Sequence, residues 1–82
     1  MQLNILTPES KVFTGEADSI QLNGFDGKFE ILNNHAPLIA ILKEGTVKVK
    51  AKNETLTFQL KSGIVEVLKN NVSVLTEGVI EE

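Results

Sequence analysis

The 82-residue sequence contains no cysteine, arginine, tryptophan or tyrosine, and it has a single histidine. Without cysteine, disulfides, thiolate metal sites and cysteine nucleophiles are excluded. One histidine also excludes multi-histidine metal sites. Phosphate loops, dinucleotide fingerprints and calcium loops are missing as well. We therefore expect no catalytic centre, no cofactor and no small-molecule substrate, and we expect a protein that works by binding.

Acidic residues outnumber basic residues by eleven to eight, which gives a formal net charge of −3 at pH 7. This is the wrong sign for a phosphate backbone, and no Trp or Tyr is present to stack on bases, so nucleic acid is not expected as a partner. No apolar run approaches the roughly 20 residues that span a bilayer, and the start lacks the features of a secretory signal. We expect one cytoplasmic domain, residues 1–82, without a membrane span.

Apolar residues recur at every second position through most of the chain, which is the period of β-strands. Their neighbours are polar, as in Val47-Lys48-Val49-Lys50, a pattern typical of antiparallel strands with one dry face. Turn signals separate the runs at Asp26-Gly27, Asn33-Asn34, Lys43-Glu44-Gly45, Lys52-Asn53-Glu54, Ser62-Gly63 and Lys69-Asn70-Asn71. The Asp-Gly pair suits a tight type I′ hairpin. These features predict an all-β sandwich or flattened barrel of roughly eight to ten short strands.

One segment departs from the alternation. Residues 36–42, Ala-Pro-Leu-Ile-Ala-Ile-Leu, are apolar at every position, so a strand here needs cover on both faces. In one interpretation the second sheet and a crossing loop supply that cover. In the other, an apolar strip faces outward and is buried by a partner protein.

The single histidine, His35, comes just before this segment. Asp26 and Glu30 are near it in sequence, but no second ligand or nucleophile motif accompanies it. We interpret His35 as a loop residue that hydrogen-bonds the backbone and fixes the turn before Pro37. Contact with a partner is a second interpretation, and a small hydrolase that uses His35 is a third.

Lysine at a hairpin tip suggests a different function. Small all-β domains of this size include lipoyl and biotinyl carriers, which present one modified lysine at such a tip. Lys52 is the nearest candidate, although its neighbours Ala51 and Asn53 only half fit the carrier pattern. A carrier domain, or another small all-β interaction module, is therefore the alternative function.

Three segments resemble one family. Residues 27–38, Gly-Lys-Phe-Glu-Ile-Leu-Asn-Asn-His-Ala-Pro-Leu, resemble the signature of the epsilon subunit of F-type ATP synthase, commonly G-E-F-G-I-L-P-G-H-A-P-L. Thr7-Pro8-Glu9 with residues 12–15 is similar to the opening of that family, and residues 63–67 with residues 71–75 are similar to its later strands. The three lie in family order and together cover essentially the whole chain.

The resemblance implies a flattened antiparallel β-sandwich of about ten short strands at the foot of the central stalk. It implies a non-catalytic rotor subunit that binds the gamma subunit and the ring of c subunits, and so couples ion translocation to ATP synthesis. The implied location is peripheral, at the cytoplasmic face of the inner membrane. Because the sequence stops at Val79-Ile80-Glu81-Glu82, the C-terminal helical hairpin of many members is expected to be absent.

Site residues are implied by family position. The gamma contact then falls on Thr7, Pro8, His35, Ala36, Pro37, Leu38 and Ala40, and the c-ring contact falls on Asp26, Gly27, Lys28, Asn33, Asn34 and His35. Lys28 stands where the family often has Glu, which reverses the charge at one expected ring contact. Asn34 stands in place of a common Gly and can still adopt the left-handed conformation that Gly allows.

Overall fold

The computed structural model describes residues 1–80, which form nine β-strands and no helix. The strands are β1 (Gln2–Leu6), β2 (Lys11–Glu16), β3 (Ser19–Gly24), β4 (Gly27–Leu32), β5 (Leu38–Leu42), β6 (Gly45–Ala51), β7 (Glu54–Leu60), β8 (Gly63–Leu68) and β9 (Asn71–Thr76). Within this part of the chain no helix could span a membrane. Glu81 and Glu82 lie outside the described residues, and so does the expectation that no C-terminal helical hairpin follows them.

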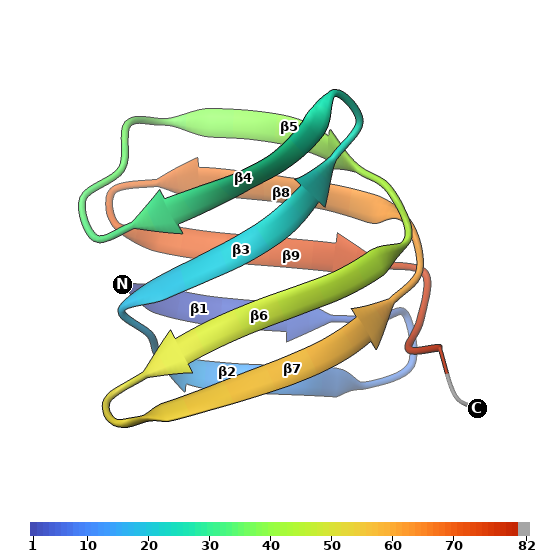
Figure 1. The fold of residues 1–82 in the computed structure, drawn as a ribbon, viewed down its shortest axis with the longest axis horizontal. Helices are drawn as coiled ribbons and strands as arrows, with labels where there is room; N and C mark the ends of the chain where they lie inside the picture. The colour runs from blue at the N-terminus through green and yellow to red at the C-terminus, as the bar shows by residue number, and fades with distance from the viewer. Residues whose placement is uncertain (81–82) are drawn as a thin grey trace.

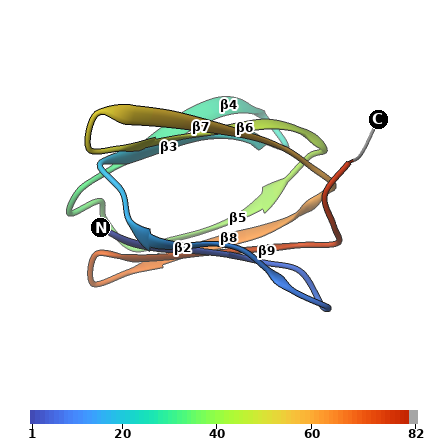
Figure 2. The same ribbon diagram turned by 90° about the horizontal axis from the view of Figure 1, so that it is seen from below.

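The strands form two layers packed face to face (Figures 1 and 2). One layer has the order β2-β1-β9-β8-β5, and the other has the order β4-β3-β6-β7. The layers join where Gly24 of β3 pairs with Leu42 of β5. The molecule measures 32 × 27 × 22 Å along its principal axes. The predicted flattened all-β sandwich is confirmed, with nine strands in the described residues rather than ten.

The strand pair β1–β9 is parallel, whereas the sequence predicts antiparallel pairing throughout. Gln2 lies opposite Asn71, and Leu6 lies opposite Leu75. The prediction depends on short turns, and such turns join only strands that follow one another in the chain. Strands β1 and β9 are the first and the last, so no turn dictates their relative direction.

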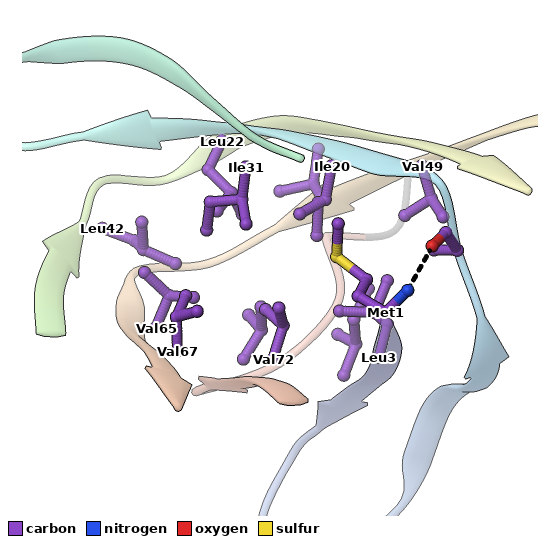
Figure 3. Close-up of a cluster of buried hydrophobic side chains, with 14 of the residues drawn as sticks. Met1, Leu3, Ile20, Leu22, Ile31, Leu42, Val49, Val65, Val67 and Val72 are labelled. Carbon is purple, nitrogen blue, oxygen red and sulfur yellow. Dashed lines mark hydrogen bonds between the residues drawn. The ribbon is translucent and has the colours of Figure 1, made fainter. Parts of the chain in front are cut away.

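The core lies between the two layers and is built from the inward-facing residues of the alternating strands (Figure 3). The buried aliphatic side chains are Met1, Leu3, Ile5, Ala17, Ile20, Leu22, Ile31, Leu42, Val47, Val49, Leu60, Val65, Val67, Val72 and Val74. The backbone nitrogen of Met1 donates a hydrogen bond to the carbonyl oxygen of Ala17 at 2.9 Å (Figure 3). Removal of this apolar surface from water is the main stabilising term of the fold.

The turn between β3 and β4 differs from the prediction. It is made by Phe25 and Asp26, one residue earlier than expected, and neither has the positive φ that a type I′ turn requires at both central residues. The type I′ prediction for Asp26-Gly27 was therefore wrong. Gly27 instead begins β4 with a φ of 136°. A type I′ turn does occur between β8 and β9, where Lys69 and Asn70 have φ values of 49° and 61°.

Candidate interaction surface

Strand β5 decides which apolar residues of the segment 36–42 face outward. Ile39 and Ile41 are 66% and 64% exposed, whereas Leu38 and Ala40 pack against the core. Successive residues of a strand point to opposite faces, so the segment supplies both a core face and an outward strip. The implied gamma contacts Leu38 and Ala40 are therefore partly buried residues that pack against the core. The outward neighbours Ile39 and Ile41 were missed, although both belong to the apolar segment.

Apolar side chains continue from β5 across three further strands. Ile41 lies opposite Ile64 on β8, Ile64 lies opposite Leu75 on β9, and Leu75 lies opposite Leu6 on β1. Ile64 and Leu75 are exposed, and Leu6 is half-buried. We call Ile39, Ile41, Ile64, Leu75 and Leu6 the apolar face. Sequence reasoning missed its last three members, because cross-strand register is not readable from one chain segment.

The four strands that carry the apolar face are almost free of charge. On β1, β5, β8 and β9 the only charged residue is Glu66. The strands of the other layer carry five charged residues, which are Lys28, Glu30, Lys48, Lys50 and Glu54. All five are exposed, and along β4 and β6 the charged residues alternate with more buried ones. Depletion of charge around exposed aliphatic side chains is a property of interface cores. The outer face of β5-β8-β9-β1 is therefore the candidate interaction surface.

The loop after β1 adjoins one end of the apolar face. The hydroxyl of Thr7 accepts a hydrogen bond from the N–H of Ser10 at 3.0 Å, and the N–H of Thr7 donates to the Ser10 carbonyl at 2.9 Å. This compact turn holds Pro8 at the surface. Thr7 and Pro8, together with Leu6 and Leu75, line a hollow of about 380 Å³. Two of the implied gamma-contact residues therefore border the apolar face.

The loop between β4 and β5 adjoins the other end of the same layer. His35 Nδ1 lies 2.7 Å from the carbonyl oxygen of Ala36, and it donates there in the tautomer that carries hydrogen on Nδ1. The predicted loop position of His35 and its hydrogen bond to the backbone are thus confirmed, whereas its role in fixing the turn before Pro37 stays a prediction. Asn34 has a φ of 63°, as predicted, and its N–H donates to Asn70 Oδ1 at 2.7 Å. Ala36 and Pro37 are exposed beyond it.

The residues implied for the c-ring contact fall into two groups. Asp26, Gly27 and Lys28 belong to the β3–β4 hairpin, whereas Asn33, Asn34 and His35 follow the opposite end of β4 (Figure 1). The six residues of β4 separate the groups by roughly 17–20 Å, since a strand rises about 3.3 Å per residue. Closeness in the sequence therefore does not bring these loops together. The side chain of Asn33 instead receives a hydrogen bond from the backbone nitrogen of Met1.

The β3–β4 hairpin presents an exposed aromatic ring that sequence reasoning missed. Phe25 at the turn is 69% exposed, and its N–H donates to the Ile41 carbonyl at 3.1 Å, which ties the hairpin to β5. A groove of about 630 Å³ lies between the two, lined by Phe25, Lys28, Phe29, Ile39 and Ile41 among others. The available signal was a large aromatic residue at a position where turns usually carry small polar residues.

Residues 1–80 contain no group of three side chains that could hold a metal ion. Lys52 lies at the tip of the β6–β7 hairpin with a φ of 56°, which is the position that a carrier lysine would occupy. The position of Lys52 is thus compatible with a carrier domain.

A family model described as the beta-sandwich domain of the ATP synthase delta/epsilon chain matches residues 1–82. The chain belongs to this family. It is 40% identical over 79 residues to the ATP synthase epsilon chain of Chlorobium limicola, a match that covers 95% of this chain and 90% of that protein. It is 35% identical over 81 residues to the epsilon chain of Caulobacter vibrioides, with 99% and 94% covered.

Other epsilon chains are longer than this one. The match to the Helicobacter pylori epsilon chain, at 31% identity, covers 98% of this chain and 65% of that protein. Family membership decides against a carrier domain and against a hydrolase that uses His35, because an epsilon chain is a non-catalytic subunit of ATP synthase. The resemblance seen in the sequence is confirmed.

Chains in two solved structures superpose closely on this fold. A chain in the Euglena gracilis mitochondrial ATP synthase has a TM-score of 0.91 at 16% identity, and the match covers 98% of this chain and 52% of that chain. A chain in a structure of the Tetrahymena thermophila mitochondrial ATP synthase central stalk and c-ring has a TM-score of 0.84 at 17% identity, with 98% and 65% covered. At these identities the likeness establishes the fold.

Proposed function

We propose that this epsilon-family chain is a component of the ATP synthase central stalk, with its apolar face bound to the gamma subunit and its β3–β4 hairpin against the ring of c subunits. It holds gamma and the ring in a fixed relation, so that ion translocation stays coupled to ATP synthesis. Its place is peripheral, at the cytoplasmic face of the inner membrane. Two observations support the proposal. The relatives are ATP synthase epsilon chains, and the fold is similar to that of a chain in a structure of a central stalk and c-ring.

The observation that carries the gamma contact is the row from Ile41 through Ile64 and Leu75 to Leu6. Burial of exposed aliphatic side chains in an interface stabilises it by roughly 25 cal/mol per Å² of apolar surface. The implied contacts Thr7 and Pro8 border this row at one end. His35, Ala36 and Pro37 lie at the other end of the layer and extend the same contact. Leu38 and Ala40 support it from the core side.

In this proposal the c-ring binds the hairpin that contains Asp26, Gly27 and Lys28. All three are exposed, and the hairpin projects from one end of the sandwich (Figure 1). Asn33 and Asn34 lie at the far end of β4, which pairs with β3 on one side only. A c-ring surface that contacts both the hairpin and these two residues therefore has to extend along the free edge of β4. Hydrogen bonds and ion pairs at the hairpin are individually weak, which suits a contact that is secured mainly through gamma.

Binding to the purified gamma subunit of the same organism tests the proposal. Ile41→Asp places a charge on the β5 side of the apolar face, at a side chain that is 64% exposed, and we expect the affinity of this variant for gamma to fall at least about tenfold. Thr57→Asp is the matched control, because Thr57 is exposed on β7 in the other layer. Urea unfolding of both variants checks that each retains the fold. Unchanged gamma binding by Ile41→Asp would count against the proposed interface.

A second experiment tests the assembly as a whole. The tagged chain is used to capture its partners from detergent-solubilised membranes of the source organism, and the captured subunits are identified by mass. We expect gamma, the catalytic subunits and the ring to be recovered with the wild-type chain, and to be lost with Ile41→Asp. Recovery of the tagged chain alone, from membranes shown to contain an intact complex, would contradict a stalk function.

A further inference from the structure

Glu66 is the single charge in the middle of the candidate interaction surface. It lies on β8, opposite Ile39 of β5 on one side and Ser73 of β9 on the other. Its outward neighbours along β8 are Ile64 and Leu68, both exposed aliphatic residues. The Glu66 side chain is exposed, and within residues 1–80 the structure shows no ion pair to its carboxylate.

A surface hollow is lined in part by Glu66. Its volume is about 350 Å³, and it is lined by Pro37, Leu38, Ile39, Glu66, Val67 and Leu68. The walls are therefore aliphatic, and one charged group lies among them. Such a shape is complementary to a long side chain with an apolar stem and a cationic end.

A partner that covers the apolar face takes Glu66 out of water. Burial of an unpaired carboxylate is strongly unfavourable and opposes the gain from the surrounding aliphatic contacts. The cost disappears if the partner supplies a cation with hydrogen bonds to both carboxylate oxygens. A surface built for docking on these four strands therefore requires a matching positive group.

We propose that the partner of this face inserts an arginine into the hollow, with its stem against Pro37, Ile39 and Leu68 and its guanidinium paired to Glu66. Arginine is assigned rather than lysine because its planar fork binds a carboxylate in a bidentate manner, and because its weaker hydration makes it the preferred cation at interfaces. The inference rests on the proposed function, in which that partner is gamma. The ion pair sets the register of gamma on a face that is otherwise apolar and weakly directional.

The first test compares two isosteric neutral variants for binding to purified gamma. Glu66→Gln leaves the arginine buried without its partner, and we expect a loss of affinity of about 30-fold or more. Glu54→Gln, at an exposed position on β7 of the other layer, is the matched control and should change affinity less than about twofold. If Glu66→Gln binds gamma as tightly as Glu54→Gln does, the inference is overturned.

The second test identifies the partner residue. Glu66→Arg should bind gamma more weakly than Glu66→Gln, and one Arg→Glu variant of gamma should restore binding at least about tenfold. Restoration by a Lys→Glu variant, or by none of the gamma variants, would contradict the arginine assignment. The proposed function is judged separately by Ile41→Asp: if that variant loses gamma binding while Glu66→Gln does not, only the Glu66 inference fails.

Discussion

The rings of Phe13 and Phe58 meet edge to face, with centroids 6.3 Å apart and an interplanar angle of 63°. Phe13 belongs to β2 and Phe58 to β7, which are the two ends of the strand order. In the described residues these strands are not hydrogen-bonded to each other, so the ring contact closes the sandwich on the side opposite to the Gly24–Leu42 junction. A stalk component has to be rigid, and this pair contributes to that rigidity.

We expect Phe58→Ala to lower the free energy of unfolding by about 2–3 kcal/mol, less than for a fully buried ring because Phe58 is only partly buried. A double-mutant cycle with Phe13→Ala should give a coupling energy of about 0.5–1.5 kcal/mol, measured by urea unfolding. Phe25→Ala, which truncates an exposed ring, should change stability by no more than about 0.5 kcal/mol. Additive effects of the Phe13 and Phe58 variants would show that the ring contact contributes nothing specific.

Gly63 tolerates no side chain, because a Cβ atom there would lie 2.1 Å from the carbonyl oxygen of Leu75. Backbone on the neighbouring strand cannot move aside cheaply, so we expect Gly63→Ala to destabilise the fold by about 3 kcal/mol. Gly78→Ala is the control, since its Cβ would meet only the flexible Lys61 side chain, at 3.6 Å. Thermal unfolding compares the two, and equal melting temperatures would refute the close approach of β8 to β9.

The β8–β9 turn carries avoidable strain at Lys69, whose φ is 49°. An ordinary side chain pays about 1–2 kcal/mol in the left-handed region, and Asn tolerates it better. Lys69→Asn should therefore raise the free energy of unfolding by about 0.5–1 kcal/mol, measured by urea unfolding. Asn70→Gly should gain less, because it removes the acceptor of the Asn34 N–H bond. A destabilising effect of Lys69→Asn would contradict the type I′ geometry.

The proposed ring contact at Lys28 should depend on ionic strength, because exposed ion pairs weaken as salt screens them. We expect Lys28→Gln to weaken binding to purified c-ring by about threefold at low salt and to have little effect at high salt. Lys50→Gln, on β6 of the same layer, serves as the control for net charge. If both variants show the same salt dependence as wild type, Lys28 makes no specific contact with the ring.

Local patterns in the sequence were enough to predict the fold class. Alternation in strands such as residues 45–51 places Val47 and Val49 inside and Lys48 and Lys50 outside, and the structure agrees. The turn signals in the sequence predicted where most strands end, and Asn34 adopts the expected left-handed conformation. These features depend on neighbours within a few positions, so one sequence contains them. Family motifs then identified the epsilon resemblance that the relatives confirmed.

Only the tertiary structure decided how distant strands meet. The parallel pairing of β1 with β9, the row from Ile41 to Leu6 and the isolation of Glu66 all depend on register between strands far apart in the chain. Tertiary structure also turned Ile39 outward and Ala40 inward in a segment that is apolar throughout, and it placed the two implied ring loops at opposite ends of β4. In each case the deciding term is burial against residues contributed by other strands, and no local pattern encodes it.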